Sequence, residues 1–165
     1  MARTTIPQPA PYTMPETDTD DRERVAEFIA LQSPREKLHL VCRWTLRCYQ
    51  DGRMVAIRVA EERGARRLDQ LLWTIADMTF LPHAIAARAT EPVLEPVLIY
   101  CADEEIEETD VLFEASGGDL LPSFERFPHI YDFAEVYDEN LRTRSRRRYT
   151  AYKEAGYRMR YVERS

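Results

Sequence analysis

Glycine is scarce in this chain of 165 residues, and none of its five glycines belongs to a phosphate-binding loop. The sequence contains neither G-x-G-x-x-G nor G-x-x-x-x-G-K, the patterns that let backbone amides approach phosphates. This absence argues against an enzyme that binds a nucleotide.

Cysteine is also rare. Cys42, Cys48 and Cys101 are odd in number and form no C-x-x-C pair, which argues against a disulfide framework or a zinc site and fits a reducing cytosol. The three histidines are isolated in sequence. A nucleophile pair of Cys101 and His129 stays open, but no nucleophile elbow surrounds Cys101, and a role in the core is the simpler reading. We therefore expect no catalytic residue, metal or cofactor.

Long apolar runs and signal sequences are absent too. No stretch approaches the roughly 20 apolar residues of a membrane span, and no basic-then-apolar start suggests export, so a cytoplasmic protein without membrane contact is expected. The net charge is −6. Any contact with nucleic acid therefore requires a local basic patch.

Residues 1–22 combine prolines with acidic side chains and have no periodicity. This composition predicts a disordered leader, followed by one domain over 23–165.

The domain alternates between strand and helix patterns. Helices are predicted from Ser33 to Gly52, over 61–73 and from Asp138 to Gly156. Apolar or branched segments predict strands at 25–31, 54–59, 97–101, 111–113 and 127–133, the last of these being the final strand. The order predicts a parallel α/β layer. The acidic run 103–110 reads as a solvated loop rather than a metal site, because it lacks the spacing of a calcium loop.

The last predicted helix concentrates positive charge. Between Arg142 and Lys153 there are six basic residues and no acidic one. Arg142, Arg146, Tyr149 and Lys153 follow one another at helical spacing and form one stripe, while Tyr152 lies on a neighbouring face that can dock on the domain. The stripe is a solvated face, a site for a short acidic peptide with an aromatic end, or a contact for nucleic-acid phosphates.

A second stretch joins an amphipathic helix to a stiff connector. The sequence LDQLLW (68–73) is followed by FLPH (80–83), in which proline holds a large aromatic near the helix end. By composition alone, Trp73 and Phe80 are core residues.

The motifs LDQLLW, FLPH and RRRYTAYKEAGY (146–157), in this order, resemble the chi subunit of bacterial DNA polymerase III holoenzyme, an accessory protein of the clamp loader. The resemblance covers about 24–162. It implies a three-layer α/β/α single domain with a mainly parallel central sheet, Rossmann-like without a nucleotide-binding loop and without catalytic activity.

The resemblance also implies two partners. The acidic C-terminal tail of single-stranded DNA-binding protein would bind Arg142, Arg146, Tyr149 and Lys153. Ala134 matches a pocket-wall position, and Thr150 replaces a lysine common in relatives, with Arg147 and Arg148 as other sources of positive potential.

The other partner would be the psi subunit of the clamp loader, or a helicase. It would contact Phe80, framed by Leu81, Pro82 and His83, with Trp73 packed beneath. DNA would be reached only indirectly. A direct single-stranded nucleic-acid-binding protein, or an adaptor for a repair helicase, remains the alternative.

Overall fold

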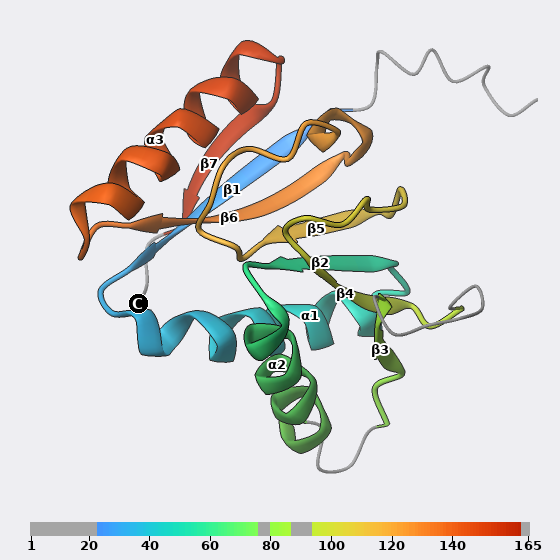
Figure 1. Ribbon diagram of the computed structural model, residues 1–165. Helices are drawn as coiled ribbons and strands as arrows, with labels where there is room; N and C mark the ends of the chain where they lie inside the picture. The colour runs from blue at the N-terminus through green and yellow to red at the C-terminus, as the bar shows by residue number, and fades with distance from the viewer. Residues whose placement is uncertain (1–22, 76–79, 87–93, 163–165) are drawn as a thin grey trace, which may run out of the picture.

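A computed structural model describes residues 23–75, 80–86 and 94–162 (Figure 1). Its helices are α1 (Lys37–Gln50), α2 (Glu62–Ile75) and α3 (Glu139–Glu154), with short 3-10 helices η1 (Pro34–Glu36) and η3 (Phe124–Arg126). Its strands are β1 (Val25–Leu31), β2 (Val55–Val59), β3 (His83–Ile85), β4 (Val97–Cys101), β5 (Val111–Glu114), β6 (His129–Glu135) and β7 (Arg158–Val162). The predicted leader, residues 1–22, lies outside the described residues.

The seven strands form one sheet in the order β3-β4-β2-β5-β6-β1-β7. Every neighbouring pair is parallel, which confirms the predicted α/β class. Strands β2, β4 and β5 are buried along their whole length, as expected for parallel strands covered on both faces.

Helices cover both faces of the sheet (Figure 1). Helices α1 and α2 pack on one face, where Val41 and Leu68 share a core with Ile57 and Phe113. Helix α3 covers the other face, where Tyr152 joins a second core. Alternate side chains of a strand point to opposite faces, so the same strands supply both cores. The predicted three-layer single domain is therefore confirmed.

Side-chain caps and glycines set the helix ends. Ser33 accepts a hydrogen bond from the Arg35 amide at 3.2 Å, and Asp138 accepts one from the Leu141 amide at 2.9 Å. Gly156, at φ +90°, adopts the left-handed conformation that glycine favours and ends α3. These ends agree with the sequence prediction.

Two strands were not predicted, and the prediction that 127–133 is the final strand is wrong. Strand β7 follows α3 and pairs with β1 at the edge of the sheet. Its mostly exposed, arginine-bearing sequence lacks the apolar run used to find the other strands. Strand β3 has three residues, too few for a visible period.

The acidic run 103–110 is a mostly exposed loop between β4 and β5, held by the buried Ile106. Across the described part of the chain, no group of three or more histidine, cysteine or acidic side chains could hold a metal ion. Within those same residues, no helix is long and apolar enough to span a membrane.

Candidate functional site

A surface pocket of about 450 Å³ lies where α3 meets the edge of the sheet. Its lining comes from β1, β6 and β7, from α3, and from the turn between β6 and α3. The lining residues are Phe28, Ala134, Glu135, Val136, Arg142, Ser145, Arg146, Tyr149 and Tyr161. We call this site the α3 pocket. It brings together four residues of the predicted tail site: Ala134, Arg142, Arg146 and Tyr149.

Aromatic and aliphatic side chains form the walls of the α3 pocket. The Tyr149 ring packs edge-on against Phe28 with 5.2 Å between centroids, yet 37% of Tyr149 stays exposed. Tyr161 and Val136 are also exposed, at 57% and 45%. Accessible apolar surface next to a rigid aromatic contact suits an incoming aromatic side chain.

Two arginines edge the pocket. Arg142 and Arg146 are exposed, and no ion pair joins either of them to a carboxylate of the described residues. Arg142 instead donates to the Val136 carbonyl at 2.8 Å. Lys153 and Thr150, the other predicted tail-binding residues on α3, are exposed but do not line the pocket. They lie further along the helix.

The acidic residue in the pocket wall has its charge compensated. Glu135 is buried and paired with Lys37 from α1. The Tyr137 hydroxyl also donates to Glu135, and burial, followed by the Glu135 charge, raises the pKa of Tyr137 to about 12. The pocket therefore offers unpaired positive charge while its one carboxylate is neutralised.

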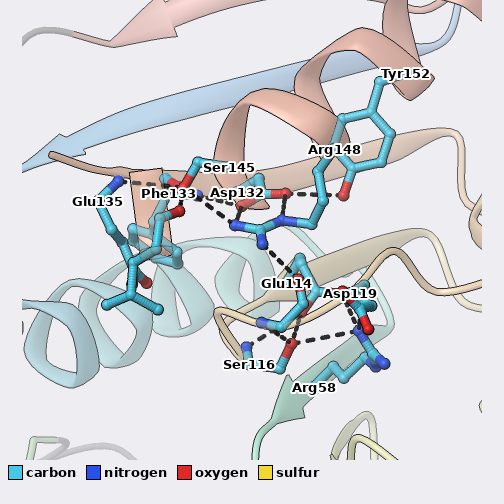
Figure 2. Close-up of polar contacts among 12 residues, drawn as sticks. Arg58, Glu114, Ser116, Asp119, Asp132, Phe133, Glu135, Ser145, Arg148 and Tyr152 are labelled. Carbon is cyan, nitrogen blue, oxygen red and sulfur yellow. Dashed lines mark hydrogen bonds and ion pairs between the residues drawn. The ribbon is translucent and has the colours of Figure 1, made fainter. Parts of the chain in front are cut away.

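Arg148 holds α3 on the sheet and does not belong to the basic surface (Figure 2). It is 1% exposed, and two of its nitrogens lie 2.8 and 3.0 Å from the Asp132 carboxylate. It also donates to the Gly118 carbonyl at 2.7 Å, and Tyr152 donates to Asp132 at 2.8 Å. The expectation that Arg148 adds positive potential at the surface is therefore wrong, because Asp132 neutralises it.

A second buried arginine lies beside this cluster (Figure 2). Arg58 donates to Glu114 at 2.7 Å and to the backbone carbonyls of Ala102 and Asp119 at 3.1 and 2.9 Å. Burial, followed by the charge of Asp132, raises the pKa of Glu114. These contacts fix the loops after β4 and β5.

A second exposed surface lies at the end of α2. Phe80 is 67% and Trp73 is 55% exposed, with 5.7 Å between their ring centroids. We call them the aromatic pair. The composition-based interpretation that Trp73 and Phe80 are core residues is wrong, because both rings are exposed, whereas the neighbouring Leu72 is buried in the core. Trp73 packs against Phe80 as expected, but it is itself exposed.

The remaining residues of FLPH are more buried than the aromatic pair and hold it in position. Leu81 and His83 are 2% and 8% exposed, and Pro82 is half-buried. The His83 ring lies 4.7 Å from that of Trp73, while its Nδ1 is 2.7 Å from the Leu81 carbonyl and its Nε2 is 3.1 Å from an Asp69 carboxylate oxygen. Phe80 and Trp73 therefore present the accessible surface.

Cys101 and His129 do not form a catalytic pair. Strand register aligns Cys101 with the end of β2 and His129 with the start of β5, and those two strands lie between them. Burial raises the pKa of the Cys101 thiol, which weakens it as a nucleophile. His129 instead contacts Glu27 and Arg53, at 2.5 and 2.7 Å.

The fold defines a class, a single Rossmann-like α/β domain with an all-parallel sheet. The C-terminal domain of the DEAD-box protein Dbp5 matches with a TM-score of 0.52 and 15% identity, over 86% of this chain and 91% of that one. S. cerevisiae Dbp5 bound to RNA and ADP BeF3 gives a TM-score of 0.58 and 14% identity, over 86% and 42%. At these identities the likeness concerns the fold alone.

Sequence comparison narrows the class to a family. The family model of the DNA polymerase III chi subunit, HolC, matches residues 24–160. The chain belongs to this family, whose members are accessory subunits of a DNA polymerase.

Individual relatives agree with the family match. DNA polymerase III subunit chi of Escherichia coli K12 is 28% identical over 120 residues, which is 72% of this chain and 79% of that protein. Its counterpart from Pseudomonas aeruginosa PAO1 is 27% identical over 128 residues, 75% and 84% of the two chains.

Phe28, Val136 and Tyr161 line the α3 pocket but were not predicted from the sequence. Phe28 lies inside a predicted strand and Val136 just before the last predicted helix, and neither carried a signal that it lines a pocket. Tyr161 was missed together with β7. In that strand Met159 and Tyr161 alternate with Arg158 and Arg160, and this period of two was the available signal.

Proposed function

We propose that this chain is a non-catalytic accessory subunit of DNA polymerase III that links the clamp loader to single-stranded DNA-binding protein, by binding that protein's acidic C-terminal tail in the α3 pocket. The observation that carries the proposal is the combination of two unpaired arginines with an exposed aromatic wall in one cavity. The family assignment also supports a cytoplasmic, replisome-associated location, and the proline-rich, acidic composition of residues 1–22 supports a separate leader.

Each part of the α3 pocket suits one part of the tail. Arg142 and Arg146 take the carboxylates in charge-assisted hydrogen bonds. The terminal phenylalanine enters between Tyr149 and Tyr161, with the small Ala134 leaving room at the wall. Lys153 and Thr150 lie further along α3 and meet upstream acidic residues. Ordering a short peptide costs conformational entropy, so binding is weak and falls with salt.

The aromatic pair is the proposed contact for the psi subunit, or for a repair helicase. Phe80 is its exposed centre, and Leu81, Pro82 and His83 fix its position. Exposed aromatic side chains on a rigid support are typical anchors of protein interfaces.

Calorimetric titration with the tail peptide of the organism's own single-stranded DNA-binding protein tests the main proposal. The Arg146→Ala, Tyr149→Ala double variant should lose binding at least about tenfold, since charge pairing and an aromatic contact each contribute on the order of 1 kcal/mol or more. A peptide without its last phenylalanine should also bind weakly.

Arg147→Ala is the matched control, because Arg147 is exposed on the same helix and does not line the pocket. It should bind the peptide nearly as the original chain does. If the original chain ignores the peptide and binds single-stranded DNA through α3 instead, the alternative of a direct nucleic-acid binder replaces the proposal.

A further inference from the structure

A second stripe of positive charge lies on the opposite face of the molecule from α3. Arg35, in η1, begins a series with His39, Arg43 and Arg47 in α1, each four residues after the one before. All four are exposed. We call them the α1 stripe. Residues four apart lie on the same face of a helix, so the stripe runs along about 18 Å of helix at 1.5 Å per residue.

Its arginines are not neutralised. None of Arg35, Arg43 and Arg47 has a carboxylate partner among the described residues, and α1 itself contains no acidic residue. Helix α2, which packs beside α1 on the same face of the sheet (Figure 1), adds the exposed Arg63 and Arg67. In a chain of net charge −6, this face is a second local concentration of positive charge, in addition to that on α3.

The α1 stripe differs chemically from the α3 pocket. No large hydrophobic side chain is exposed on α1, whereas Tyr149, Val136 and Tyr161 are exposed at the α3 pocket. A short acidic peptide needs an apolar anchor to offset the conformational entropy that it loses on binding, and the stripe offers none. A regular row of guanidinium groups instead matches a ligand with repeated, evenly spaced anionic groups.

We propose that the α1 stripe binds the phosphate backbone of single-stranded DNA without reading its sequence. Arginine forms bidentate hydrogen bonds with phosphate, and bound cations on the DNA are released when arginines replace them. The site goes beyond the proposed tail site, since it lies on the other side of the sheet and uses different residues. If the proposed tail site is also right, the chain would contact a DNA strand covered by single-stranded DNA-binding protein in two ways, through the tail of that protein and through the DNA phosphates.

Fluorescence anisotropy of a labelled oligothymidylate with the full chain tests this proposal. Three arginine contacts predict a log–log salt slope of about −2, so affinity should fall roughly 10- to 20-fold between about 50 and about 200 mM salt. The Arg43→Glu, Arg47→Glu variant should bind at least about tenfold more weakly. Arg43→Gln, Arg47→Gln serves as a milder second pair, and circular dichroism checks that each variant is folded.

The Arg142→Glu, Arg146→Glu variant is the matched control on α3 and should keep its affinity for DNA. Each of these results would overturn the proposal: no DNA binding by the original chain at about 50 mM salt, unchanged binding by both α1 variants, or a loss confined to the α3 variant. Labelled polyglutamate that binds the α1 stripe as tightly as DNA would make it a site for acidic protein segments, which also overturns the proposal.

Discussion

At the scale of single residues, arginines of one helix have opposite roles. Arg146 is exposed and edges a pocket, whereas Arg148, two positions later, is buried against Asp132. A helix turns by about 200° over two residues, so the two side chains face opposite sides of α3. The sequence RRRY does not by itself distinguish them, because the distinction depends on Asp132 lying beneath α3 in β6.

The burial of Arg148 predicts a large effect on stability. Arg148→Ala leaves the Asp132 carboxylate buried without its cation, which should lower the free energy of unfolding by about 3–5 kcal/mol. Arg147→Ala, at an exposed position on the same helix, should change it by no more than about 0.5 kcal/mol. Urea unfolding of both variants measures the difference. Equal effects would mean that the Arg148–Asp132 pair does not hold α3 in place.

At the scale of elements, the sequence predicted the buried strands and the capped helices but not β3 and β7, the strands at the two edges of the sheet. Strands β2 and β4 are apolar throughout because helices cover both of their faces, so their sequences are distinctive. Strand β7 has one free edge and mostly exposed side chains, and its sequence resembles that of a loop. Since β7 supplies Tyr161, missing the strand left one wall of the α3 pocket unpredicted.

Phe80 and Leu81, two adjacent residues before β3, should respond differently to replacement by alanine. Phe80→Ala should leave the free energy of unfolding within about 0.5 kcal/mol of its original value, because most of Phe80 is exposed. Leu81→Ala should cost about 2–5 kcal/mol, since it removes a buried side chain from the core. Thermal or urea unfolding provides the comparison. Unfolding caused by Phe80→Ala would restore the core interpretation of that residue.

At the scale of the whole molecule, the three surfaces lie on different elements. The α3 pocket adjoins β7 at one edge of the sheet, and the aromatic pair lies beside β3, which forms the other edge. Five strands separate these two edges. We therefore expect Phe80→Ala to weaken binding of the psi subunit or helicase and to leave affinity for the tail peptide unchanged. The family resemblance predicted that the tail site and the aromatic pair are separate surfaces. The order of the strands, which explains how far apart they lie, could be learned only from the structure.

The most direct test of the tail site is an NMR titration of the isotope-labelled full chain with the tail peptide. We expect amide shifts to change around Phe28, Ala134, Ser145, Tyr149 and Tyr161, to saturate together, and to shrink when the peptide lacks its last phenylalanine. Shifts confined to Trp73 and Phe80 or to α1, or no shifts at all, would contradict the assignment of the α3 pocket as the site that binds the tail.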